Sequence, residues 1–189
     1  MFLYIVRHGQ SEANAVRRHS GQDNAPLTEK GIEDAKRAGG KLQDICFDRV
    51  YASDQLRAMQ TAKNALPSYE PIPDRRLREI DVGSLTGHLI DECRERYGEY
   101  YDEIVRERHF SVYGGEDHAD QYQRVIDFIK MLEAAEDCEN VAVFTHGGAI
   151  NCFIDYALGI PMSERRIKVE NGSVTVFEYA DGKWRLCLR

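Results

Sequence analysis

The sequence lacks a long apolar segment, a cysteine framework and an excess of positive charge. No apolar run approaches the roughly 20 residues that span a bilayer, and no basic leader with an apolar core is apparent. The five cysteines are scattered through 189 residues, odd in number and without a Cys-x-x-Cys pair. These absences argue against a membrane span, a signal peptide, a disulfide framework and a zinc cluster. They indicate a cytoplasmic protein with reduced thiols.

The charge balance is also informative. The formal net charge is −7, with 25 Lys and Arg against 32 Asp and Glu, which argues against a nucleic-acid partner. An anionic substrate must therefore be bound by a local group of cations. His19, His88, His109 and His118 lack the spacing of metal ligands, so we expect no metal and no other cofactor.

What the chain does contain is an alternation of short apolar runs with amphipathic segments. Its length suits one domain with a proper core, and 42% hydrophobic with 30% charged residues is typical of globular proteins. Strands are predicted at 2–6, 47–52, 69–73, 140–145, 167–169, 173–179 and 184–188. Helices are predicted at 28–42, 55–66, 117–135 and 149–158, with a loop at 10–27. This order predicts an α/β fold, a three-layer α/β/α sandwich around a mostly parallel mixed sheet with antiparallel strands late in the chain.

Polar residues mark where the helices should begin. The candidates for the N-cap positions are Thr28, then Ser53 or Asp54, and then Asp117 or Asp120. Each supplies a side-chain oxygen that can accept from a free N–H of the first helical turn.

Residues 84–116 differ from the rest in being charged, aromatic and interrupted by glycine. Within a single domain over 1–189, we predict that they form a helical lid insertion over the C-terminal edge of the sheet. Its aromatic residues are expected to pack together, with lining of a pocket as the alternative: Tyr97, Tyr100, Tyr101, Phe110 and Tyr113. Its arginines are expected to form a solvated face, with binding of a second anionic group as the alternative: Arg94, Arg96, Arg106 and Arg108.

Basic side chains follow three of the predicted strands. Arg7 and His8 follow the first strand, Arg57 lies near the start of the helix after the second, and His146 follows the strand at 140–145. Because the carboxyl ends of parallel strands share one edge, these side chains can converge there. Two guanidiniums can hold a tetrahedral oxyanion, and a histidine beside them can donate a proton or attack. Taken singly, each has a structural alternative, such as an ion pair of Arg57 with Asp54.

Six short motifs, spread in order over the whole chain, include these residues. They are Arg7-His8-Gly9 with Asn14; Arg18 with Gly21; 26–31 (PLTEKG); Ser53-Asp54, Arg57-Ala58 and Gln60-Thr61-Ala62; 77–83 (LREIDVG); and 145–148 (THGG). Together these motifs resemble the histidine phosphatase superfamily, also called the phosphoglycerate mutase-like family.

The resemblance implies a role for each central residue. His8 would be the nucleophile and become a phosphohistidine, while Arg7, Arg57 and His146 would bind the transferring phosphoryl oxygens. Glu79 would protonate the leaving oxygen and later help to deprotonate water. Such an acid must hold a proton near its working pH, so we expect burial or nearby negative charge to raise its pKa. A surface ion pair with neighbouring arginines is the alternative for Glu79.

The resemblance also assigns contacts with the substrate outside this central group. The residues concerned are Asn14, Arg18, Gly21, Gln22 and Gly147. Hydrogen bonding within the loop is the alternative for Asn14 and Arg18.

The function expected from these residues is metal-independent hydrolysis of a phosphomonoester on a small phosphorylated metabolite. A mutase of the phosphoglycerate type is the alternative, but the chain is short and has Gly-Gly after His146, where mutases of this family have Gly-Asn-Ser and longer insertions. A non-enzymatic binding or signalling protein on the same fold would be favoured by loss of His8, Arg57 or Glu79, and all three are present. The sequence indicates neither which phosphomonoester is the substrate nor the oligomeric state.

Overall fold

A six-stranded mixed sheet forms the centre of the computed structural model, which describes residues 1–135, 137–161 and 167–187. The strand order is β3-β2-β4-β1-β5-β6. Neighbours among β1 to β4 pair in parallel, and β5 and β6 are antiparallel, which confirms the predicted mixed sheet. The strands are β1 (Phe2–Arg7), β2 (Arg49–Ala52), β3 (Ile72–Pro73), β4 (Asn140–Thr145), β5 (Val174–Ala180) and β6 (Lys183–Cys187).

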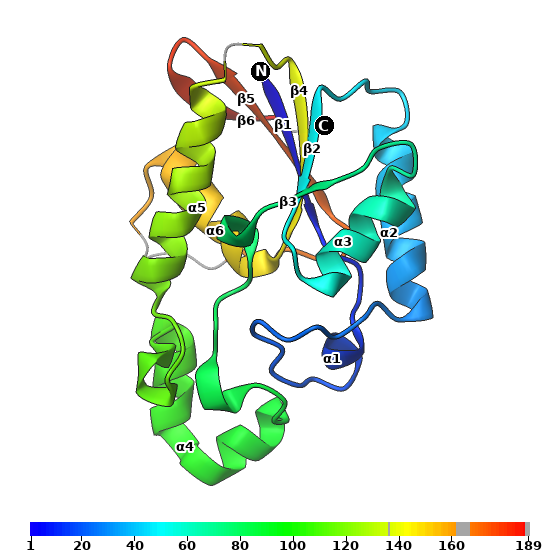
Figure 1. Cartoon of the computed structure of the whole chain (residues 1–189). Helices are drawn as coiled ribbons and strands as arrows, with labels where there is room; N and C mark the ends of the chain where they lie inside the picture. Colours follow the sequence, from blue (N-terminus) through cyan, green and yellow to red (C-terminus); the bar gives the residue numbers. More distant parts are fainter. Residues whose placement is uncertain (136, 162–166, 188–189) are drawn as a thin grey trace.

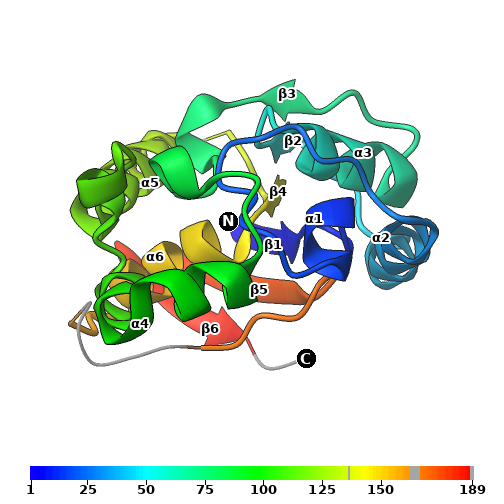
Figure 2. The ribbon, with the colours of Figure 1, turned by 90° about the horizontal axis from the view of Figure 1, so that it is seen from below.

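Helices cover both faces of this sheet. Figures 1 and 2 show α2 (Glu29–Leu42) and α3 (Leu56–Ala65) on one side, and α5 (His118–Glu133) and α6 (Gly147–Leu158) on the other. β1 is buried on both faces, because its side chains alternate between the two apolar cores that these helix pairs cover. The predicted three-layer α/β/α sandwich is confirmed.

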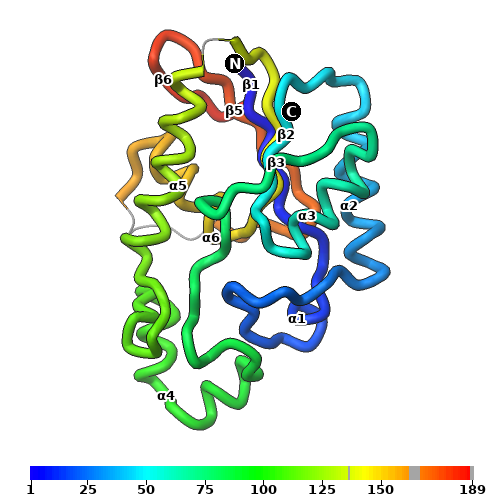
Figure 3. The backbone as a smooth tube through the Cα atoms, viewed as in Figure 1, coloured from blue at the N-terminus to red at the C-terminus, as the bar shows by residue number. Residues whose placement is uncertain are grey.

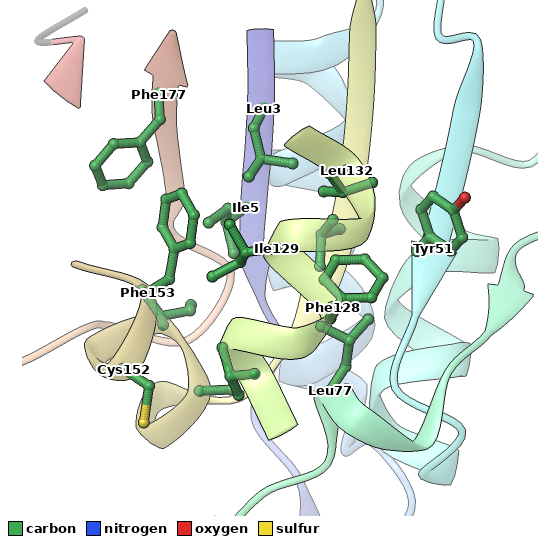
Figure 4. Close-up of a cluster of buried hydrophobic side chains, with 14 of the residues drawn as sticks. Leu3, Ile5, Tyr51, Leu77, Phe128, Ile129, Leu132, Cys152, Phe153 and Phe177 are labelled. Atoms are coloured by element: carbon green, nitrogen blue, oxygen red, sulfur yellow. The ribbon is translucent and has the colours of Figure 1, made fainter. Parts of the chain in front are cut away.

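The larger core lies between the sheet and the α5–α6 pair. Leu3 and Ile5 of β1 pack there against Phe128 and Ile129 of α5, as Figure 4 shows. Each such side chain contributes about 1.5–3 kcal/mol when it is fully buried. This packing fixes β1 and β4 relative to α6, and the loops at the ends of these elements carry the candidate site.

The start of α3 differs from the prediction. Its N-cap is Gln55, and neither Ser53 nor Asp54 caps the helix. The Ser53 hydroxyl lies 2.9 Å from Nε2 of His146, and the Asp54 carboxylate accepts two hydrogen bonds of 2.6 Å from Arg78. Both side chains therefore bind partners far along the chain, while Thr28 and Asp117 cap α2 and α5 as predicted.

The strand predicted at 167–169 is absent, and these residues form an irregular segment. Side chains rather than a neighbouring strand bind its main chain. Asn151 donates from Nδ2 to the carbonyl of Ile167 at 3.1 Å and accepts from the Ile167 N–H at 3.3 Å, while Arg7 donates from Nη1 to the carbonyl of Val169. The last predicted strand corresponds to β6, and Leu188 lies outside the described residues.

Residues 84–116 lie beyond the carboxyl ends of the parallel strands, at the same end of the molecule as the short helix α1 (Glu12–Ala15) (Figures 1 and 3). α1 falls within the predicted loop at 10–27. The insertion holds α4 (Ile90–Glu107), as its predicted helical character requires, and Gly98 divides this helix into two pieces with φ 59° and ψ −143°. The flanking 3₁₀ turns are η2 (Gly83–Leu85) and η3 (Phe110–Tyr113).

The insertion has a small apolar core of its own. Tyr101 and Phe110 are buried in it, as the sequence predicted, whereas Tyr100 is 57% exposed. All five cysteines are free thiols. Within the described parts of the chain, no helix has the length and hydropathy of a membrane span.

Candidate active site

The carboxyl ends of three neighbouring parallel strands place four basic side chains together. Arg7 at the end of β1 pairs in register with Thr145 at the end of β4, so His8 and His146 are adjacent. Their ring centroids lie 5.0 Å apart. Arg57 comes from the first turn of α3, which follows β2. We call Arg7, His8, Arg57 and His146 the strand-end cluster, and its convergence is what the sequence predicted.

The His8 side chain is held in one tautomer. Its Nδ1 lies 2.7 Å from the carbonyl oxygen of Gly9, which can only accept, so Nδ1 carries the hydrogen and Nε2 keeps its lone pair. Burial, and then the charges of Arg57 and Arg7, lower the pKa of His8 to about 3. His8 is therefore a neutral imidazole at physiological pH, which is the nucleophilic form.

His146 is completely buried beside it. Its Nε2 lies 2.9 Å from the Ser53 hydroxyl, and among the described residues its Nδ1 has no hydrogen-bond partner. Burial and the neighbouring charge of Arg57 lower the pKa of His146. Ser53 is a functional neighbour that the sequence reasoning missed, because it was interpreted as a helix cap.

Arg57 is only 1% exposed and is oriented by the loop that follows α1. It donates from Nη2 to the carbonyl of Gly21 at 2.8 Å and from Nη1 to the carbonyl of Asp23 at 3.0 Å. The Asp23 carboxylate lies 3.5 Å away. Burial lowers the pKa of Arg57, but a guanidinium starts so high that it stays charged. The alternative of an ion pair with Asp54 is wrong, since that carboxylate binds elsewhere.

Arg7 completes the cluster. Its Nη1 donates to the carbonyl of Val169, while its Nε is buried without a partner in the described structure. Gly147, in the first turn of α6, lies against this guanidinium, since a Cβ there would be 3.6 Å from Nε. Buried polar atoms without partners are rare in folded proteins. Nε of Arg7 and Nδ1 of His146 are two of them in one cluster, as expected of a site that receives an anion.

A second group of residues surrounds the Glu79 carboxylate. Oε1 accepts from the Ile80 N–H at 2.9 Å, from Nε2 of Gln121 at 3.0 Å and from Nη2 of Arg108 at 3.2 Å. Oε2 accepts from the Gly148 N–H at 3.1 Å, at the N-terminus of α6. We call Glu79, Arg108, Gln121 and Gly148 the Glu79 cluster.

The expected rise in the pKa of Glu79 is wrong for this structure. Burial alone would raise the pKa, but the Arg108 guanidinium and the hydrogen bonds from Ile80, Gln121 and Gly148 outweigh it and lower the pKa to about 2. All four donors favour the charged form. Glu79 is therefore a carboxylate in this structure. The alternative of a surface ion pair is also wrong, because the side chain is only 22% exposed and its partner belongs to the insertion.

Arg108 was not identified from the sequence, where it was grouped with three arginines of a solvated face. That description holds for Arg94 and Arg106, whose side chains are 50% and 67% exposed, but the Arg108 side chain is only 16% exposed. It ends α4 in the left-handed conformation, with φ 56°. Nothing local in the sequence signals this turn, since Arg is not a residue that favours it.

A glycine is required at position 148, because the side chains of Glu79 and Arg108 lie close to its Cα. A Cβ at this position would lie 2.1 Å from Oε1 of Glu79 and 2.3 Å from Nη2 of Arg108. The second glycine after His146 thus makes room for the ion pair.

A cavity of about 330 Å³ lies between the two clusters. Among the residues with predicted substrate contacts, Asn14, Arg18 and Gly21 line it, whereas Gln22 and Gly147 do not. The Gln22 amide instead donates to the carbonyl of Glu79 at 3.2 Å. The lining residues are Arg7, His8, Asn14, Arg18, His19, Ser20, Gly21, Arg57, Glu79, Ile80, Val82, Val105, Arg108 and Phe110.

The loop residues Asn14 and Arg18 also have partners within the protein. The Asn14 carbonyl oxygen accepts from the Ser11 N–H at 3.2 Å, and Arg18 donates to the Asp23 carboxylate at 2.8 Å. In the described part of the chain, no three or more His, Cys, Asp or Glu side chains are grouped as ligands for a metal ion.

Known proteins are similar to this chain in sequence and in fold. The family model of the histidine phosphatase superfamily (branch 1) matches residues 3–188. A relative from Salmonella paratyphi A, named "Probable phosphoglycerate mutase GpmB", is 30% identical over 187 residues, which cover 96% of this chain and 86% of the relative.

Solved structures agree with this match. YhfR from Bacillus stearothermophilus has a TM-score of 0.90 at 30% identity, covering 99% of this chain and 95% of that one. The alpha-ribazole phosphatase from Shigella flexneri has a TM-score of 0.90 at 26% identity, covering 100% and 95%. A mycobacterial glucosyl-3-phosphoglycerate phosphatase in complex with VO3 has a TM-score of 0.88 at 26% identity, covering 99% and 97%. Since the family model and these structures match nearly the whole chain, the protein belongs to the histidine phosphatase superfamily.

Proposed function

We propose that the protein hydrolyses a phosphomonoester of a small phosphorylated metabolite through a phosphohistidine at His8. The observation that carries this proposal is the state of His8. It is neutral, its Nδ1 is bound to Gly9, and its free Nε2 lies on a cavity that two buried guanidiniums, Arg7 and Arg57, also line. A lone pair beside concentrated positive charge suits attack on a phosphoryl group.

In the first step, Nε2 of His8 attacks phosphorus and the bond from phosphorus to the ester oxygen breaks. Arg7 and Arg57 stabilise the negative charge on the phosphoryl oxygens, and Nδ1 of His146 is the buried atom left to contact one of them. The leaving oxygen takes a proton from the Glu79 carboxyl and departs as an alcohol, which leaves Glu79 as a carboxylate.

In the second step, water attacks phosphorus, the bond between phosphorus and Nε2 breaks, and inorganic phosphate leaves. The Glu79 carboxylate accepts the proton of that water, which restores the protonated carboxyl that the first step uses. No step requires a metal ion, because the cations of the strand-end cluster balance the phosphoryl charge.

The insertion at 84–116 is proposed to act as a lid over this cavity. Val105 and Phe110 line the side of the cavity that the insertion forms. A volume of about 330 Å³ suits a small phosphorylated metabolite.

Phosphoryl transfer between positions of a phosphoglycerate is the second candidate, and the name of the Salmonella relative favours it. A mutase must keep the phosphorylated enzyme away from water while its substrate reorients. The two are separated by incubating the protein with 3-phosphoglycerate and measuring both free phosphate and 2-phosphoglycerate. Phosphate as the main product supports hydrolysis, and 2-phosphoglycerate as the main product overturns it.

The direct test is hydrolysis of p-nitrophenyl phosphate with EDTA present, followed by trapping of labelled phosphate on the protein and treatment of the trapped protein with acid and with base. We expect wild type to turn over and to carry a base-stable, acid-labile phosphate, and His8→Ala to do neither. Equal rates for wild type and His8→Ala would show that the protein is not this enzyme. A panel of phosphorylated metabolites then identifies the substrate.

A further inference from the structure

Arg108, at the end of α4 in the insertion, forms an ion pair with Glu79, the proposed acid. We propose that Arg108 is a positioning residue that holds Glu79 ready to accept a proton from water and must leave Glu79 before that carboxyl can protonate a leaving oxygen. This inference rests on the proposed function and concerns how the same site alternates between its two steps.

The arrangement around Oε1 carries the first part. Three donors, the Ile80 N–H, Nε2 of Gln121 and Nη2 of Arg108, point at this one oxygen. Oε1 is occupied by these donors, so a proton would bind to Oε2, which accepts only from the Gly148 N–H. The Arg108 charge beside the carboxyl disfavours that proton. With Arg108 in place, the cluster therefore holds a carboxylate, the form that the second step requires.

Several other ionisable groups lie around Glu79. Arg124 of α5 donates to the Glu79 carbonyl at 3.0 Å, and the Glu116 carboxylate beside it is paired with Arg124 at 2.8 Å. Arg7 from β1 and Arg57 from α3 are cations that interact with it electrostatically. His8 is held neutral, and burial raises the pKa of Cys152 in α6 to about 12, so this thiol is neutral too. The first step still needs a protonated Glu79, so one of the donors must be able to move away.

Arg108 is the donor that can move. The Ile80 and Gly148 donors are main-chain groups, and Gln121 is fully buried and also bonded to the carbonyl of Arg78 at 3.4 Å. Arg108 has a long side chain that lines the cavity. Within the described residues, both of its side-chain hydrogen bonds, to Glu79 and to Gln121, leave from Nη2, so Nε and Nη1 are available to an anionic substrate.

The position of Arg108 also connects the acid to the insertion. It caps the C-terminus of α4, and its carbonyl accepts from the His118 N–H at the start of α5 at 3.0 Å. A shift of α4 when substrate fills the cavity would therefore move the guanidinium relative to Glu79. Departure of the leaving group returns it, and Glu79 is again the base.

The test compares kcat/KM against pH for two substrates. The p-nitrophenolate of p-nitrophenyl phosphate can leave without a proton. The leaving oxygen of glycerol 2-phosphate must be protonated as it departs, because it would otherwise leave as an alkoxide. Removing a neighbouring opposite charge shifts a carboxyl pKa by about one unit or more. In Arg108→Gln, we expect the alkaline limb of the pH profile for glycerol 2-phosphate to move to higher pH by about one unit or more. At a fixed pH on that limb, kcat/KM should rise about tenfold. The alkaline limb for p-nitrophenyl phosphate should stay in place.

Two further variants keep the inference testable. Arg108→Lys retains the charge, and its profile should stay close to wild type. Arg106→Gln removes the same charge two residues away, where Arg106 pairs with Glu107 on the surface, and it should leave both profiles unchanged. If Arg108→Gln does not fold, NMR titration of the Glu79 carboxyl in Arg108→Met and wild type replaces it, with a higher midpoint expected in the methionine variant because the guanidinium charge beside Oε1 is lost.

Two results would overturn the inference: superimposable profiles of Arg108→Gln and wild type, or an equal loss on both substrates. Failure of the proposed function looks different. In that case wild type itself shows no His8-dependent hydrolysis of either substrate.

Discussion

The two sides of the cavity are built in different ways. The strand-end cluster is placed by main chain: His8 and His146 follow the paired positions Arg7 and Thr145, and Arg57 binds the main-chain carbonyls of Gly21 and Asp23. The Glu79 cluster is placed by side chains from separate elements, with Arg108 from the end of α4 and Gln121 from α5. The first side is built at the strand ends of the sheet, while the second includes a residue of the insertion, Arg108.

This difference predicts which variants depend on the leaving group. A residue of the strand-end cluster stabilises phosphoryl charge whatever the ester, so its loss should affect all substrates alike. A residue of the Glu79 cluster serves the leaving oxygen, so its loss should matter most when that oxygen is a poor leaving group.

Glu79→Gln should show the largest selective effect. Loss of a general acid lowers rates by about 10²–10⁴-fold, so we expect kcat/KM for glycerol 2-phosphate to fall by that amount. p-Nitrophenyl phosphate should lose far less, because its leaving group departs as an anion. Steady-state rates at pH 6 with both substrates measure the ratio. An equal fall in kcat/KM for both substrates would show that Glu79 stabilises the phosphoryl group and does not protonate the leaving oxygen.

Arg57→Ala should reduce hydrolysis of both substrates. Removing one preorganised donor to a developing oxyanion costs about 10²–10³-fold in kcat. The same factor is expected for glycerol 2-phosphate and p-nitrophenyl phosphate, since Arg57 contacts neither leaving group in the proposed mechanism. Rates near wild type would remove Arg57 from the site. Lys63→Ala, an exposed change on the same helix, is the matched control.

The sequence predicted the first side of the cavity better than the second, for the same structural reason. His8 and His146 each follow a strand directly, so recognising two parallel strands was sufficient to bring them together. The contact of Arg108 with Glu79 spans 29 residues and depends on a left-handed turn that no local pattern marks. The contact of Ser53 with His146 is also not predicted from the sequence, because a serine before a helix is more often an N-cap.

Ser53→Ala should lower the rate of hydrolysis less than Arg57→Ala does. It removes the hydroxyl 2.9 Å from Nε2 of His146 and leaves that buried nitrogen without its partner. Loss of a buried hydrogen bond costs about 1–1.5 kcal/mol, which corresponds to about tenfold in kcat if the ring loses its orientation. The loss should be equal for both substrates, and Ser53→Thr should restore part of it. A change confined to glycerol 2-phosphate would contradict the separation of the two sides.

Tyr101→Phe should show the smallest effect, because it alters only how the insertion is attached. The Tyr101 hydroxyl lies 2.5 Å from Nε2 of His19, in the loop that also orients Arg57. Losing this hydrogen bond should lower the free energy of unfolding by about 1 kcal/mol, measured by urea denaturation at pH 7. Since neither catalytic cluster contains Tyr101, kcat for p-nitrophenyl phosphate should stay within about twofold of wild type.

The same contact gives a pH dependence with a definite sign. Burial, and then the neighbouring His88, lower the pKa of His19 below its usual value of 6.5. As the pH falls below 6.5, the unfolded chain therefore binds a proton that the folded protein does not, and the folded state loses stability. His19→Gln removes the titrating imidazole, so the unfolding free energy of the variant should decline less than that of wild type between pH 7 and pH 5. A parallel decline in both proteins would show that His19 titrates normally and that the insertion is attached without a charge-sensitive contact.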